Sequence, residues 1–110
     1  MSRGIEVNIS SDNTQNVLDA LKSAIETSLE AVGLAAEGYA KGACPVDTGT
    51  LRDSITHTVD GNDAYIGTNV EYAPYVEFGT SRMKAQEFLR PAAQDHASEY
   101  SEIFRNNLSN

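Results

Sequence analysis

The residues that could carry chemistry are few and are scattered along the sequence. The two histidines, His57 and His96, do not form an HExxH or similar metal-binding spacing. The single cysteine, Cys44, lies in a turn before Pro45 with no histidine or CxxC partner nearby, which favours a buried thiol over a nucleophile. We therefore expect packed or surface histidines, no intrachain disulfide, no metal and no cofactor.

The triplet Asp47, Thr48 and Gly49 matches the catalytic motif of aspartic proteases. Those enzymes hold two carboxylates close together, each on a loop between buried strands. Here the triplet follows Cys-Pro-Val at the end of a predicted helix and leads into a polar turn. Turn and cap roles for Asp47 and Thr48, with backbone freedom at Gly49, explain the same residues. We predict that the protein is not an enzyme, and a protease that uses Asp47 is the least favoured hypothesis.

An aromatic segment, YAPYVEFG, begins at Tyr72. Pro74 fits the first turn of a short helix, and Gly79 fits its C-terminal stop. We expect the large apolar side chains of this helix to be core residues, namely Tyr72, Tyr75, Val76 and Phe78. The segment would then anchor the chain that follows it.

The next segment, residues 82–90, is net positive in a protein whose net charge is −8. Its basic residues are Arg82, Lys84 and Arg90. Two interpretations stay open: a solvated connection, or a docking loop that contacts an acidic partner surface or, transiently, DNA phosphates. The acidic remainder would repel DNA over most of the surface, which excludes stable sequence-specific DNA binding.

Length and composition predict a single globular domain over residues 1–110. A domain of this size buries a modest fraction of its surface, so it gains when partner subunits cover some of the rest. No run approaches the roughly 20 apolar residues that span a bilayer, and the sequence MSRGIEVNIS lacks the apolar core of a signal peptide. We expect a protein that is intracellular at synthesis, without a standard secretion signal or a membrane segment.

The N-terminal segment predicts a strand followed by a helix cap. Residues 4–10 alternate apolar and polar side chains, which is the period of a half-buried strand. Ser11 or Asp12 then offers an N-cap, and Gln15 completes a capping box. A helix is therefore expected to begin at about residue 12.

Apolar residues recur every three or four positions over residues 12–42, which predicts one long amphipathic helix. Such a helix would be on the order of 45 Å long, whereas a compact domain of about 100 residues has a radius of gyration of about 13 Å. Two interpretations stay open. The helix protrudes and packs on a neighbouring subunit, or it bends at Gly33 or Gly38 and wraps around its own sheet.

The second half of the chain predicts a hairpin and a last helix. After one helical turn at residues 50–54, strands are expected at about 54–60 and 63–69, because the Asp-Gly and Gly-Asn steps between them favour a tight turn. Pro91 fits the first turn of a helix that continues to the C-terminus. The predicted fold class is α+β, with a small antiparallel sheet packed in two layers against a long N-terminal helix and a C-terminal helix.

Three pieces of the sequence resemble the tail-completion (neck, head-to-tail joining) family of long-tailed bacteriophages. They are CPVDTGTLRDSI, YAPYVEFGT and FLRPA, and the resemblance runs from about residue 12 to 105. Each piece alone is weak, whereas all three in this order and at this length are fairly specific. Glu87 departs from the pattern, since such proteins usually have a proline there. The motif residues carried over are Pro45, Asp47, Thr48, Gly49, Leu51, Tyr72, Phe78, Gly79 and Pro91.

The resemblance implies a structural protein of the virion neck that is made in the host cytoplasm. Subunits of that family form a ring, expected to be hexameric, between the head-closure (connector) proteins and the tail terminator protein, and double-stranded DNA passes through its lumen without specific binding. The residues that we expect at a partner or subunit contact are Arg82, Lys84, Arg90, Glu77 and Phe88. The alternative hypothesis is a small prophage-encoded interaction module that binds an acidic partner through residues 82–90.

Overall fold

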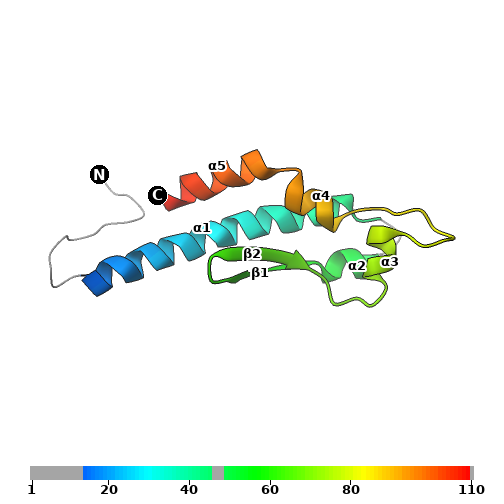
Figure 1. Ribbon diagram of the computed structural model, residues 1–110, viewed down its shortest axis with the longest axis horizontal. Coiled ribbons are helices and arrows are strands. Elements are labelled where there is room, and N and C mark those ends of the chain that lie inside the picture. Colours follow the sequence, from blue (N-terminus) through cyan, green and yellow to red (C-terminus); the bar gives the residue numbers. More distant parts are fainter. Residues whose placement is uncertain (1–13, 46–48, 110) are drawn as a thin grey trace.

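The computed structural model describes residues 14–45 and 49–109. Its fold is α+β, as predicted, and Figure 1 shows the long helix with the β-hairpin along one side and the last helix along the other. The strand expected at residues 4–10, its following N-cap, and Asp47 and Thr48 lie outside the described residues. The elements in chain order are α1 (Thr14–Ala43), α2 (Gly49–Ser54), β1 (Thr56–Asp60), β2 (Asp63–Gly67), α3 (Ala73–Phe78), α4 (Leu89–Gln94) and α5 (Ala97–Leu108).

Helix α1 is continuous from Thr14 to Ala43 and protrudes. The molecule measures 64 × 23 × 20 Å with a radius of gyration of 18.0 Å, against about 13 Å for a compact chain of this length. In Figure 1, α1 begins beyond the tips of both the hairpin and α5, and Leu18 and Leu21 in this part are 54% and 41% exposed. The protruding helix is therefore confirmed, while its contact with a neighbouring subunit stays a prediction.

Gly33 serves packing within the uninterrupted helix α1. It is buried against β1, and a Cβ atom at this position would lie 2.7 Å from Cδ2 of His57. Because only a glycine leaves this space, β1 can approach the backbone of α1 closely. Gly38 is different, since it is exposed and nothing lies within 4 Å of an equivalent Cβ.

The hairpin forms where the sequence predicts it. Strands β1 and β2 pair antiparallel, with His57 opposite Ile66 and Val59 opposite Ala64. Gly61 in the turn has a φ of 64°, a value that favours glycine. Burial alternates along β1, so one face of the hairpin packs on α1 while the other faces solvent.

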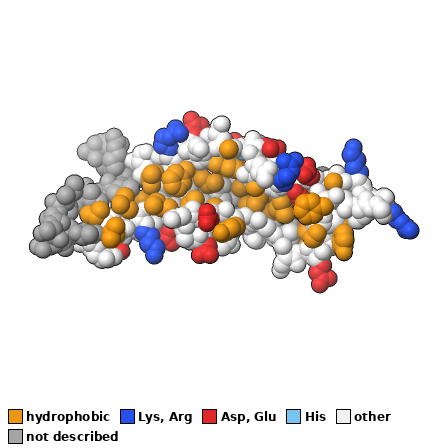
Figure 2. Space-filling view, in the orientation of Figure 1, with side chains coloured by type: hydrophobic (Ala, Val, Ile, Leu, Met, Phe, Trp, Pro, Cys, Tyr) orange, Lys and Arg blue, Asp and Glu red, His pale blue; other side chains and the backbone are white. Residues whose placement is uncertain are grey.

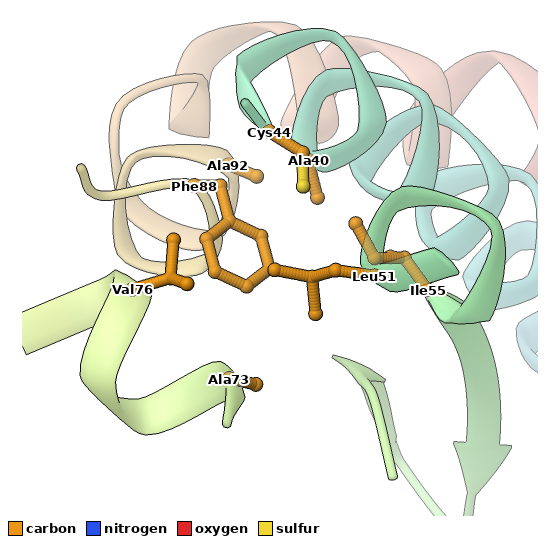
Figure 3. Packing of buried hydrophobic residues seen from close by; sticks show 8 residues of the cluster. All are labelled: Ala40, Cys44, Leu51, Ile55, Ala73, Val76, Phe88 and Ala92. Carbon is orange, nitrogen blue, oxygen red and sulfur yellow. The ribbon is translucent and has the colours of Figure 1, made fainter. Parts of the chain in front are cut away.

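The core lies at the end of the molecule where α1 finishes and where α2, α3 and α4 meet. Figure 3 shows the ring of Phe88 at its centre, with Leu51 and Val76 pointing toward it from opposite sides. Phe88, Leu51 and Ile55 are the largest fully buried side chains among the described residues. Burying a side chain of this size contributes about 1.5–3 kcal/mol. The remaining core members are small: Ala40, Cys44, Ala73 and Ala92.

The C-terminal helix differs from the single helix that Pro91 predicts. Its start agrees, since α4 begins at Leu89 and Pro91 lies in its first turn, but the helix is interrupted between α4 and α5. At the interruption His96 has φ −123° and ψ 30°, and its ring stacks on that of Tyr39 with centroids 3.7 Å apart. The Tyr100 hydroxyl donates to the carbonyl of Ala92 in the last turn of α4. These tertiary contacts outweigh the continuous helical spacing and set α5 along α1.

Candidate functional site

The candidate site is the surface formed by α3 and by the loop that follows it. A helix of six residues can bury only one side, and here Ala73, Val76 and Glu77 face the interior. Tyr72, Tyr75 and Phe78 are 39%, 58% and 76% exposed. The prediction that these three aromatics are core residues is therefore wrong, and Val76 is the buried anchor of the helix. Tyr72, Tyr75 and Phe78 also recur three residues apart, so spacing alone does not choose the buried side of this helix.

Glu77 holds α3 and α4 together through its carboxylate. Oε1 accepts hydrogen bonds from the backbone N–H groups of Phe88 and Leu89 at 3.0 and 2.9 Å, and Oε2 accepts one from Arg90 at 3.0 Å. These N–H groups belong to the first turn of α4, where no local side chain caps them. A buried carboxylate is stable here because it accepts three hydrogen bonds.

This role changes the expected contact residues. Glu77 is 4% exposed and Phe88 is 0% exposed, so both side chains lie inside the subunit. Neither presents a surface to a neighbour in the described structure, in contrast to the sequence-based hypothesis. Their buried contacts instead join α3 to the start of α4, and these contacts fix both ends of the exposed loop between them.

The loop from Gly79 to Gln86 is held in one conformation by backbone contacts. Gly79 has a φ of 77°, and a Cβ there would lie 2.7 Å from the nitrogen of Ala85 and 2.8 Å from the carbonyl oxygen of Met83. The N–H of Thr80 donates to the carbonyl of Met83 at 2.8 Å, and the N–H of Gln86 donates to the carbonyl of Val76 at 2.8 Å. The loop is thus tied to α3 and presents its side chains outward.

The three basic residues do not act as one group. Arg82 and Lys84 are exposed in the loop, and neither side chain forms an ion pair with a described residue. Arg90 lies in α4 and binds Glu87 with two hydrogen bonds, Nε to Oε2 at 2.7 Å and Nη2 to Oε1 at 2.8 Å. This pairing lowers the pKa of Glu87 and raises that of Arg90. Glu87, the departure from the family pattern, therefore neutralises the third member of the predicted basic group.

The other motif residues that the structure describes have structural positions. Leu51 is fully buried in α2, and Gly49 begins that helix. Pro45 follows the end of α1, and Pro91 lies inside α4. Beside α3, a cleft of about 400 Å³ lies between residues 68–71, α3 and Leu89.

The histidines and the cysteine are packed residues. His57 lies between two carboxylates of α1, with Nδ1 2.6 Å from Glu37 and Nε2 2.5 Å from Glu30. The hydrogen bond to Glu37 is the main cause that raises the pKa of His57, and Glu30 adds to it. Cys44 is buried, as expected. No group of three or more His, Cys, Asp or Glu side chains in residues 14–45 and 49–109 is arranged to hold a metal ion.

A second apolar surface, which the sequence analysis does not identify, lies on α1 and α5. Leu34 is 62% exposed and lines a hollow of about 450 Å³ together with Ala31 and Asn107. Two carboxylate residues, Glu26 and Glu30, border the same hollow. The signal in the sequence is that Leu34 falls outside the helical stripe of apolar residues on α1.

Comparison with known proteins places the chain in a phage family. Residues 11–79 match the family described as "Bacteriophage HK97-gp10, putative tail-component". This range includes α1, α2, the hairpin and α3, whereas the basic loop and the C-terminal helices follow it. No curated protein and no solved structure matches the chain. Among the described helices, none is long and apolar enough to cross a membrane. The chain belongs to the HK97-gp10-like family of bacteriophage tail components.

Proposed function

We propose that the protein is a structural, non-enzymatic component of the phage neck that joins the tail to the DNA-filled head. Copies of the chain form a ring, a hexamer by resemblance to tail-completion proteins, between the head-closure proteins and the tail terminator. The genome passes through the lumen of this ring. The family membership supports the tail role, and the net charge of −8 suits a channel in which DNA must slide without being held.

The observation that carries the proposal is the uncovered apolar surface of a small, elongated subunit. Phe78 and Tyr75 are 76% and 58% exposed on a rigid short helix, and Leu34 is 62% exposed on another face. Large exposed apolar side chains that are clustered mark protein contacts. A ring covers such surfaces on every subunit at once.

The test compares particles made with and without this chain. Deletion of its gene should give DNA-filled heads and separate tails, and supplying the chain in trans should restore joined particles. Mass spectrometry of purified wild-type particles should find the chain, and cryo-electron microscopy should place it at the neck. Absence of the chain from purified particles would contradict the proposal. A monomer in isolated solution would not, because such rings can close on their partners.

The second candidate, an interaction module that binds an acidic partner, rests on Arg82 and Lys84. Both are exposed and form no ion pair with a described residue. This function predicts that the chain is absent from particles and binds an acidic protein in infected cells. The same mass spectrometry of particles therefore separates the two functions.

A further inference from the structure

The exposed side of α3 and its loop combine the features of a protein contact. Tyr72, Tyr75 and Phe78 lie on one side of α3, and Met83, 38% exposed, lies in the loop beside them. Figure 2 shows hydrophobic side chains gathered over α3, with Lys and Arg side chains at the tip of the molecule beyond them. Aromatic residues, Met and Arg are the types enriched in interface centres. We call Tyr72, Tyr75, Phe78, Arg82, Met83 and Lys84 the aromatic-basic surface.

Contacts within the subunit hold this surface in place. Val76 and Glu77 fix α3 through its buried side. At position 79 the backbone lies so close to Ala85 that only glycine fits. A surface that is already ordered loses little conformational entropy on binding. The arrangement therefore suits a permanent contact.

The charge of the surface selects the kind of partner. Arg82 and Lys84 form no ion pair with a described residue, and two such cations in a chain of net charge −8 are too few to hold DNA against the repulsion of the remaining surface. They suit a protein surface with a few carboxylates around an apolar centre. Such a surface exists on the same chain.

The hollow at Leu34 has the complementary chemistry. Leu34 and Ala31 supply apolar atoms, and two carboxylates lie at the border. Glu26 forms no ion pair with a described residue, whereas Glu30 is already shared with His57. Its volume is about 450 Å³. The other exposed leucines, Leu18 and Leu21, are flanked by both Asp19 and Lys22 and offer less attraction to cations. The Leu34 hollow is therefore the better match.

We infer that the aromatic-basic surface of one copy docks in the Leu34 hollow of a neighbouring copy, with Phe78 in the hollow and Arg82 and Lys84 beside Glu26 and Glu30. The two surfaces are different parts of one chain, so the contact is heterologous and repeats from copy to copy. Such contacts close into rings when the rotation permits. This inference rests on the proposed ring and names the surfaces that form it.

Site-specific crosslinking in cells that assemble particles tests the contact. A photo-crosslinking amino acid replaces Phe78, and a control chain carries it in place of Tyr65, which is 54% exposed on the hairpin. We expect a dimer-sized product from position 78 whose crosslinked peptide contains residues 26–34 of a second copy, and none from position 65. A crosslink from position 78 to another protein or another segment, or no crosslink above the control, overturns the inference. If the chain is still found in purified particles, the proposed function stands even then.

Charge reversal provides an independent readout. The double variant Arg82→Glu and Lys84→Glu should reduce incorporation into particles about tenfold, and adding Glu26→Lys should restore a large part of it. All three residues are exposed, so thermal unfolding of each variant should match the wild type. A matched control replaces Arg105, which is exposed on α5 and belongs to neither surface, by Glu and should leave incorporation unchanged. A double variant that incorporates normally, or a triple variant without rescue, contradicts the pairing of these surfaces.

Discussion

Two parts of the molecule are held together differently. One is the end built around Phe88, and the other is the elongated part formed by α1, the hairpin and α5, which we call the shaft. At the Phe88 end, apolar side chains from α1, α2, α3 and α4 pack around one buried ring, and Glu77 satisfies the backbone of α4. Along the shaft, polar and aromatic contacts join the elements: His57 bridges two carboxylates, and His96 stacks on Tyr39. The fully buried large apolar side chains therefore gather at the Phe88 end, whereas exposed apolar side chains occur on both parts, with Phe78 at that end and Leu34 on the shaft.

The first prediction concerns how much the buried ring of Phe88 stabilises the protein. Phe88→Ala should lower the free energy of unfolding by about 3–5 kcal/mol, because it removes a fully buried ring and leaves a cavity among residues that cannot collapse fully. Phe78→Ala is the matched control, since its ring is 76% exposed, and it should change stability by no more than about 0.5 kcal/mol. Equilibrium urea unfolding measures both. If Phe78→Ala lowered the free energy of unfolding as strongly as the expected loss for Phe88→Ala, the ring of Phe78 would have to be buried.

The second prediction concerns the buried carboxylate at the same end. Glu77→Gln keeps the size of the side chain, but one of its terminal atoms becomes a donor that faces a backbone N–H group. We expect a loss of about 1–3 kcal/mol in the free energy of unfolding. Glu71→Gln, an exposed residue before α3, should be nearly neutral. If Glu77→Gln were equally neutral, the three hydrogen bonds would not be what fixes α4.

The elements of the fold could be predicted from local signals, and their packing only in part. The spacing of apolar residues gives α1, and the Asp-Gly-Asn turn gives the hairpin, because each signal acts within a few residues. The break at His96 could not be predicted, since it depends on Tyr39, which is far away in the sequence. Helical spacing alone favoured a continuous helix.

The candidate site shows the same division. The sequence identifies the segment correctly, because Pro74 and Gly79 bound α3 as expected. It does not tell which side of so short a helix is buried, and the aromatics were assigned to the core on their hydrophobicity. The role of Glu77 depends on backbone N–H groups that the loop brings close, and only the structure shows it facing the start of α4. The pairing of Arg90 with Glu87 is local, because the two residues are three apart in the sequence.

The third prediction addresses the shaft through the pH dependence of its polar bridge. The pKa of His57 is raised above its ordinary value of 6.5, so its contribution to stability is complete below that pH and is lost as the pH rises through the raised value. The pKa of Glu37 is lowered, by Lys41 first and then by His57, so its contribution is present above 4.5 and is lost as the pH falls through the lowered value. The bridge should be strongest between these two limits.

The measurement is urea unfolding of the wild type and His57→Gln between pH 5.5 and 9. We expect the wild type to lose about 1 kcal/mol more than the variant over this range, because a glutamine side chain does not titrate. His96 is kept in both chains and serves as the internal control. Parallel curves for the two proteins would show that the bridge does not stabilise the shaft.

The smallest expected effects come from the two glycines within α1, and they test whether the hairpin sits tightly on the shaft. Gly38→Ala should raise the free energy of unfolding by about 0.5–1 kcal/mol, because alanine favours a helix interior and no atom lies within 4 Å of the new Cβ. Gly33→Ala gains the same helical preference but places its Cβ 2.7 Å from the His57 ring, which two carboxylates hold in place. It should therefore give no gain, or a loss of up to about 1 kcal/mol. Equal stabilisation by both substitutions would show that β1 can move away from α1 at little cost, and the shaft would then be looser than the contact between Gly33 and His57 implies.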